Sequence, residues 1–328
     1  MRTPEVGVTS ESRAPRGTGP YAVITRLDVP ASRLPVPAPV PVPETRYIAR
    51  GPDGDRTVLV SVPLAGADPQ RFMVEADASR YLLGPWAYPA TDLARPGEAP
   101  WHARPYLPAL PLPTALAVHG GPLPERTVRA LGAALAETLA ISHGQNLTHA
   151  GVSPAAVLLA VDGPRLTCFG AVRAAAPDGT ARTGLPGLDP GSLPPEQASG
   201  GRPRPMGDVY ALGATLAYAA TGTTAPEREE LPPALRSVIG RCLARDPGDR
   251  PQLAELQESF SPASTSPVAT QTASRAAALL GPGWLPARVI AAIAHQSAAL
   301  LSAEPDSLAP AARTAEPGPI APAARTQD

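Results

Sequence analysis

The spacing of apolar residues changes near residue 108, and this change limits the folds that the chain can adopt. Before it, two short runs, TRYIAR (45–50) and TVLVSVP (57–63), flank the turn GPDGD and are typical of strands. After it, PERTVRALGAALAETLAISHG (124–144) and DVYALGATLAYAATG (208–222) have the period of helices, and the second is almost wholly apolar. The sequence therefore predicts an α+β fold with a small strand-rich lobe and a larger helical lobe.

Proline sets boundaries within this plan, because its ring fixes φ and removes a backbone donor. The 45 prolines are about three times the average share. A helix is expected over 67–83, with Val74 on its apolar side, and a strand over 101–108 leads into a hinge. The expected segments are a disordered N-terminus (1–20), a small lobe (21–107) with a proline-rich insert (30–43), a helical lobe (108–260), a linker (261–274), an appended amphipathic helix (275–304) and a disordered tail (305–328).

Charge and composition exclude several classes of partner. The formal net charge is -1, so neither nucleic acid nor an anionic membrane surface is an expected partner. The apolar stretch at 289–301 is too short to span a bilayer, and residues 1–20 lack the apolar core of a signal peptide. We read Cys168 and Cys242 as reduced, buried thiols and expect a cytoplasmic protein.

The chain contains no lysine, since all 28 residues in the Lys+Arg count are arginine. Three motifs follow one another in the second half of the chain, namely LPPEQ (193–197), DVYALG (208–213) and CLARDPGDRP (242–251). With these motifs the chain resembles the bacterial serine/threonine protein kinases over about residues 20–258. The resemblance implies a bilobal kinase-like fold, in which Asp208 holds the backbone of the catalytic loop and Glu196 pairs with Arg250.

The stretch LTHAGVSPAAVLLAVDGPRLTCFG (147–170) corresponds to the catalytic loop and the metal-binding segment of that family. It retains His149, Phe169 and Gly170, to which we assign structural roles. The family's catalytic groups are replaced throughout: Ser61 stands for the strand lysine, Gly151 for the catalytic base, Ser153 for the loop lysine, Ala156 for the metal-binding asparagine and Cys168 for the metal-binding aspartate. Because Mg²⁺ prefers oxygen ligands, a thiol is a poor substitute. We therefore expect no catalytic residue and no metal site.

Two further features concern the nucleotide pocket. The family's glycine-rich loop is replaced by LDVPASRLPVPAPVPVPE (27–44), whose prolines remove the backbone donors that phosphates need. Glu75 stands where the family has the acidic residue of its Lys–Glu pair, and Arg104 stands at the position before the hinge. We expect Arg104 to pair with Glu75 and to fill part of the pocket. The family's substrate-docking helix is shortened to TTAPEREE (223–230).

These losses predict a pseudokinase, a regulatory or scaffolding module that works through protein contacts, with no cofactor. Its expected partner is another protein, for which an active kinase and a neighbouring-gene product are the candidates. The alternative is a divergent phosphotransferase that binds ATP and Mg²⁺ in an unusual way, and a third reading is a nucleotide-binding switch without turnover. A thermal shift with ATP, with and without metal, separates these readings.

Overall fold

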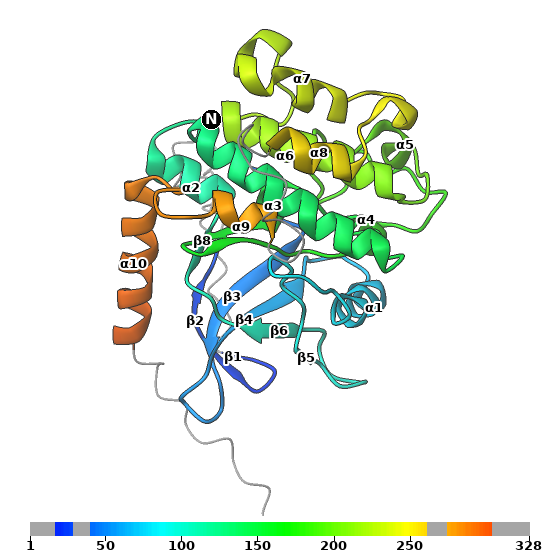
Figure 1. Ribbon diagram of the computed structural model, residues 1–328. Helices are drawn as coiled ribbons and strands as arrows, with labels where there is room; N and C mark the ends of the chain where they lie inside the picture. Colours follow the sequence, from blue (N-terminus) through cyan, green and yellow to red (C-terminus); the bar gives the residue numbers. More distant parts are fainter. Residues whose placement is uncertain (1–16, 29–39, 261–273, 304–328) are drawn as a thin grey trace, which may run out of the picture.

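The computed structural model describes residues 17–28, 40–260 and 274–303, and it has two lobes (Figure 1). A β-rich lobe lies below a larger helical lobe in that view, and a single helix runs along the side of both. The expected α+β fold with two kinase-like lobes is confirmed. The expectations for 1–16, 29–39, 261–273 and 304–328 lie outside the described residues.

The small lobe is a six-stranded antiparallel sheet with one helix, and the strands follow the spatial order β1-β2-β3-β4-β6-β5. Its elements are β1 (Gly17–Thr18), β2 (Tyr21–Arg26), β3 (Glu44–Arg50), β4 (Thr57–Pro63), α1 (Pro69–Ser79), β5 (Asp92–Leu93) and β6 (His102–Pro105). β1 pairs with β2, so the expected disorder up to residue 20 is wrong for Gly17–Thr18. This pairing is a tight hairpin, with Thr18 opposite Tyr21, and the polar composition of the stretch does not reveal it.

The helical lobe contains a three-stranded sheet, β7-β8-β9, and a bundle of helices. The strands are β7 (Ala109–Pro111), β8 (Val157–Ala160) and β9 (Gly163–Leu166). The helices are α2 (Leu112–His119), α3 (Glu125–Gly144), α4 (Ala171–Ala175), α5 (Pro195–Ala198), α6 (Pro205–Thr221), α7 (Pro233–Cys242) and α8 (Leu253–Phe260), with 3-10 turns at Pro154–Ala156, Arg228–Glu230 and Pro247–Asp249. α6 packs between α3 and α7, which explains why its sequence is apolar on all sides.

Helix α1 is shorter than expected, and its buried face differs from the expected one. Asp68 caps it by accepting hydrogen bonds from the backbone N–H groups of Gln70 and Arg71. The buried residues Phe72, Ala76 and Ser79 recur at helical spacing. Val74, which we placed on the apolar face, is 65% exposed. With so few apolar residues in this helix, tertiary contacts rather than periodicity select its inner face.

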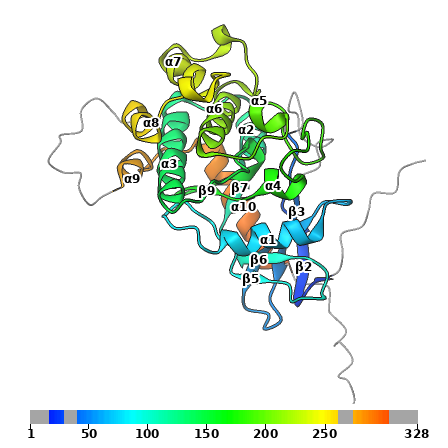
Figure 2. The same ribbon diagram turned by 90° about the vertical axis from the view of Figure 1, so that its right-hand side faces the viewer.

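The appended segment forms two helices, α9 (Arg275–Leu279) and α10 (Ala287–Ser302), rather than one. α10 lies against α2 and β7 and extends beside the small lobe, as the two views show (Figures 1 and 2). Trp284, which precedes α10, is buried, and its indole N–H donates to the carbonyl of Val161 at 2.7 Å. Within the described ranges, no helix has both the length and the apolar character that crossing a membrane requires.

Candidate functional site

The loop that begins at His149 is held by the carboxylate of Asp208, from the first turn of α6. Oδ2 of Asp208 accepts the backbone N–H of His149 at 2.7 Å, and Oδ1 accepts that of Ala150 at 2.7 Å. His143 Nε2 also contacts Asp208, at 2.8 Å. The His149 ring meets the Phe169 ring edge to face, with centroids 5.4 Å apart. Asp208 therefore shapes the loop by binding its backbone and is itself buried.

An ion pair joins α5 to the segment before α8. Arg250 donates to both carboxylate oxygens of Glu196, at 2.7 and 2.9 Å, and its side chain is fully buried. The same guanidinium lies over the ring of Tyr210, 5.1 Å from the centroid. A bidentate, stacked arginine of this kind holds two loops in one relative position.

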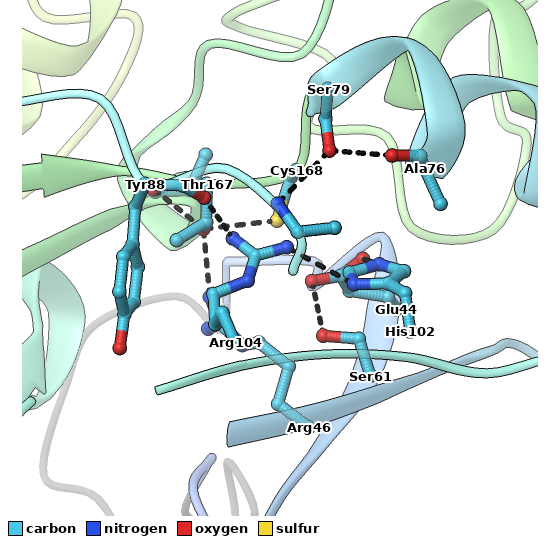
Figure 3. Close-up of polar contacts among 12 residues, drawn as sticks. Glu44, Arg46, Ser61, Ala76, Ser79, Tyr88, His102, Arg104, Thr167 and Cys168 are labelled. Carbon is cyan, nitrogen blue, oxygen red and sulfur yellow. Dashed lines mark hydrogen bonds and ion pairs between the residues drawn. The ribbon is translucent and has the colours of Figure 1, made fainter. Parts of the chain in front are cut away.

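Between the lobes, Ser61 meets a buried carboxylate (Figure 3). Its hydroxyl donates to Glu44 Oε1 at 2.9 Å, and His102 Nε2 lies 3.3 Å from Glu44 Oε2. Arg104 Nη2 lies 3.2 Å from His102 Nδ1. Since a guanidinium only donates, Nδ1 accepts and His102 is neutral, with its proton on Nε2. Glu44 therefore brings a negative charge next to Ser61, the position at which the resemblance places the strand lysine.

The ionisation states agree with these hydrogen bonds. Burial alone would raise the pKa of the Glu44 carboxyl, but hydrogen bonding to His102 and nearby positive charges outweigh burial and lower the pKa to about 2. Burial lowers the pKa of His102, which keeps its ring neutral despite the neighbouring carboxylate. Near neutral pH the cleft thus contains an ionised Glu44 beside an uncharged imidazole.

Glu75 and Arg104 lie in this cleft, but they do not pair with each other. Glu75 accepts two hydrogen bonds from Arg173 of α4, at 2.8 and 2.6 Å. Arg173 also lies over the Phe169 ring, 4.9 Å from its centroid. Arg104 instead donates to the carbonyl of Tyr88 at 2.8 Å and contacts His102. The expected Glu75–Arg104 pair is therefore wrong, because a nearer arginine from another element reaches the carboxylate of Glu75.

A third charged contact joins the sheet to the helical lobe. Arg46 on β3 donates to both carboxylate oxygens of Asp28, with Nε 2.9 Å from Oδ2. Its Nη1 lies 3.3 Å from Thr167 Oγ1, next to Cys168 (Figure 3). Arg46 is completely buried. Its positive charge is therefore committed to a side chain of this chain and is not free to hold a phosphate.

Apolar side chains fill the hinge side of the cleft. One buried cluster joins the sheet of the small lobe to β7, β8 and α10, and its members are Leu27, Ile48, Leu59, Ala109, Leu158, Ala160 and Leu300. Leu59 is 2% exposed and so is Leu158, so little space remains between the two sheets. Side chains of the protein itself occupy this region.

The end of the proline-rich insert lies over the loop at Gly151. Val40 packs against the core of the helical lobe, and Pro43 lines a small hollow with Gly151 and Leu188. Pro43 approaches so closely that a Cβ at Gly187 (φ +80°) would lie 2.7 Å from the Pro43 Cα. Residues 40–43, which lead into β3, thus touch the helical lobe.

A separate cavity of about 270 Å³ lies on the α1 side of the cleft. Residues from β3, α1, β6, the segment after Cys168 and the loop 185–188 line it, and they include Glu44, Glu75 and Arg104. Ala65 and Gly66 are exposed and stand at its edge. It is separate from the filled region near the hinge, because no residue of the apolar cluster lines it.

Sequence comparison identifies the relatives of this chain. It is 31% identical over 270 residues to "Serine/threonine-protein kinase AfsK" of Streptomyces coelicolor, an alignment that covers 76% of this chain and 32% of that protein. It is 32% identical over 264 residues to "Probable serine/threonine-protein kinase PkwA" of Thermomonospora curvata, with coverages of 74% and 34%. The chain belongs to the bacterial serine/threonine protein kinase family. This kinase-like chain spans about a third of the length of these relatives. A comparison with protein-family models found no match to the chain.

Within the kinase frame, Gly151 occupies a position that excludes a side chain. A Cβ added there would lie 2.0 Å from the carbonyl oxygen of Cys168 and 3.1 Å from the N atom of Ala171. Both are backbone atoms, so neither can rotate away. The close approach of the loop to the segment after β9 therefore depends on glycine, and an aspartate cannot be accommodated without moving the backbone.

Other positions at which the resemblance places the catalytic groups are also buried. Cys168 is 4% exposed, and burial raises the pKa of its thiol to about 12, so it is a thiol and not a thiolate. Ser153 is 8% exposed, and Ala156 is completely buried in the 3-10 turn before β8. Among residues 17–28, 40–260 and 274–303, no group of three or more His, Cys, Asp or Glu side chains could hold a metal ion.

Sequence reasoning missed three residues that shape this kinase-like cleft, namely Glu44, His102 and Arg173. Glu44 and His102 lie on strands of a mostly apolar sheet. A polar residue at an inward-facing strand position was the sequence signal that could have identified them. Arg173 had no such signal, because α4 is short and its contact with Glu75 spans 98 residues of sequence.

Proposed function

We propose that this chain is a pseudokinase, a non-catalytic module of the kinase family that regulates or scaffolds another protein. The observation that carries the proposal is the buried Glu44 carboxylate, which accepts a hydrogen bond from Ser61 where a phosphate-binding lysine would stand. A nucleotide phosphate would approach this negative charge at a cost that grows with burial. The absence of lysine from the whole chain supports the same conclusion.

Steric features support the proposal independently of charge. Leu27, Ile48, Leu59 and Leu158 pack together between the lobes, where a planar base would have to enter. Gly151 has no room for a catalytic carboxylate. The end of the insert, with Pro43, covers the same loop. A nucleotide would therefore have to displace the chain's own side chains before it met any metal ligand.

The first prediction concerns ATP. We expect the melting temperature to stay unchanged in millimolar ATP, with or without Mg²⁺ or Mn²⁺, because the binding region is filled and negatively charged. A ligand at 100 times its dissociation constant would add about 2.7 kcal/mol, which is a readily measured rise. Differential scanning fluorimetry checks this, with the kinase domain of an active relative as positive control.

A metal-dependent rise in melting temperature, or transfer of phosphate to a protein substrate, would instead support the alternative, a divergent phosphotransferase. The names of the relatives, which are all serine/threonine-protein kinases, make this alternative worth the assay. A rise with ATP alone and no turnover would support a nucleotide-binding switch.

The proposed partner is another protein, for example an active kinase or the product of a neighbouring gene. A location in the cytoplasm is part of the proposal, and it is supported by Cys168 and Cys242, which are both free and buried thiols. A pull-down from native lysate with the full chain is repeated without residues 276–328, after a melting curve has established that the shortened chain folds, because this segment contributes buried residues. The comparison tests whether the appended helices recruit the partner.

A further inference from the structure

The cavity beside α1 has features that the proposed function does not use. Its volume of about 270 Å³ exceeds the roughly 150 Å³ of an apolar cavity that takes up benzene. Apolar side chains form much of its wall, and two phenyl rings, Phe72 and Phe169, belong to it. Such a cavity has room for a small aromatic or aliphatic molecule.

The ionised groups on its wall are mainly carboxylates. Glu44, Asp68 and Glu75 line the cavity, whereas Arg104 is its only lining cation in the described part of the chain. The arginines that pair with Asp68 and Glu75, namely Arg71 and Arg173, are not among the lining residues. The wall therefore carries three carboxylates and one guanidinium, and because Arg173 binds both oxygens of Glu75, Glu44 is the carboxylate with acceptor sites to spare.

Glu44 is the deepest of these carboxylates, and it lacks a directly contacting cation. Among described residues, no guanidinium lies within 4.0 Å of it, and its partners are the Ser61 hydroxyl and His102. His102 is neutral, since Arg104 donates to its Nδ1. A carboxylate can accept about four hydrogen bonds, so Glu44 has two acceptor sites left. Arg104 and Arg46 stabilise this charge from beyond 4.0 Å, so in the described part of the chain no cation contacts the carboxylate directly.

We propose that this cavity binds a small organic cation, an ammonium compound with an apolar body, whose charged group donates to Glu44. The phenyl rings serve as apolar wall for the body of the ligand, since Phe72 stacks on the His102 ring and Arg173 lies over the Phe169 ring. The chemistry is the reverse of that needed for a nucleotide, whose phosphates would repel Glu44. The inference deepens the proposed function, on which it rests, by assigning a ligand class to a cleft that does not take ATP.

Three probes of similar shape and different charge test this inference. They are 2-phenylethylammonium, the neutral 2-phenylethanol and the anionic phenylacetate, each titrated into the full chain by isothermal calorimetry near pH 7. Because a hydrogen bond to a charged group contributes more than a neutral one, the ammonium probe should bind about tenfold more tightly than the alcohol. Phenylacetate should show no binding.

Two variants link the binding to this cavity. Glu44→Gln keeps the size of the side chain, and it should weaken the ammonium probe about tenfold while leaving 2-phenylethanol almost unchanged. Ala174→Leu fills the cavity without altering its charge and should weaken both probes. The control Glu125→Gln, at an exposed ion pair on α3, should change neither. Circular dichroism and melting curves establish that each variant is folded.

Equal affinities for the three probes, or ammonium binding that survives both Glu44→Gln and Ala174→Leu, would overturn the inference. Failure of every probe, with ATP also inactive, overturns the ligand class and leaves the pseudokinase proposal standing. If ATP binds and the ammonium probe does not, both proposals fail.

Discussion

His149 is a buried residue whose ring nitrogens have no hydrogen-bond partner among the described residues. It is 1% exposed and contacts the Phe169 ring. Asp208 binds the backbone N–H of His149 and not its ring. Within the described residues, the ring of His149 therefore has packing contacts and no hydrogen bond.

This environment predicts a pH dependence of stability. Desolvation by burial lowers the pKa of His149 from 6.5 to about 4. Between these values the unfolded state binds more protons than the native state, so the free energy of unfolding falls as the pH is lowered from about 6.5 towards 4. The contribution of this residue to the loss is about 2 kcal/mol at pH 5 relative to pH 7.5.

Urea unfolding of the wild type and of His149→Leu at both pH values measures this contribution. The variant should lose less stability on acidification, whereas His295→Gln, at an exposed position on α10, should follow the wild type. Parallel losses in the wild type and His149→Leu would show that His149 does not titrate in this window.

At the scale of elements, α1 is tied to α4 by the Glu75–Arg173 pair. Both side chains are partly buried, with exposed fractions of 13% and 28%. Arg173 also donates to the carbonyl of Thr148 at 3.0 Å, so one guanidinium joins α1 to the loop before His149. This contact fixes the position of α1, although the chain has no lysine to do so from β4.

A double-mutant cycle tests this connection. Glu75→Gln and Arg173→Leu should each destabilise the protein, and their coupling energy should be about 1–2 kcal/mol, because the two groups are in direct contact. Glu75→Gln combined with Arg104→Leu should be additive within about 0.5 kcal/mol. Equilibrium unfolding in urea gives these values. Coupling of Glu75 to Arg104, and not to Arg173, would contradict the geometry.

For the whole molecule, α10 connects the two lobes on the hinge side (Figures 1 and 2). Leu300 enters the apolar cluster that contains Ile48 and Leu59 of the small lobe and Leu158 of the helical lobe. Arg50 of β3 reaches the carbonyl of Leu300 at 3.5 Å. The appended helix thus contributes to the core between the lobes.

Adjacent leucines on α10 offer a matched test of this role. Leu300 is 7% exposed and Leu301 is 82% exposed. Leu300→Ala should reduce the free energy of unfolding by about 2–3 kcal/mol, while Leu301→Ala should change it by less than about 0.5 kcal/mol. Hydrogen exchange in β3 and β4 should rise in Leu300→Ala. Similar effects of the two substitutions would contradict the docked position of α10.

The sequence by itself determined the fold class and the frame of the kinase-like site. Apolar periodicity predicted the two lobes, and the motifs around Asp208 and Glu196 predicted contacts that the structure contains. These contacts join residues 54 to 59 positions apart, so the resemblance to the kinase family predicted them and local pattern did not. The missing lysine also required no structure, since composition alone establishes it.

Only the tertiary structure decided which charges meet. It paired Glu75 with Arg173 instead of Arg104, and it brought Glu44 to Ser61 and Arg46 to Thr167. It also placed Leu300 between the lobes. Arginine side chains are long and reach several carboxylates, so the choice of partner depends on backbone positions far apart in sequence. Periodicity and motifs do not specify those backbone positions, because the positions are set only when the two lobes pack together.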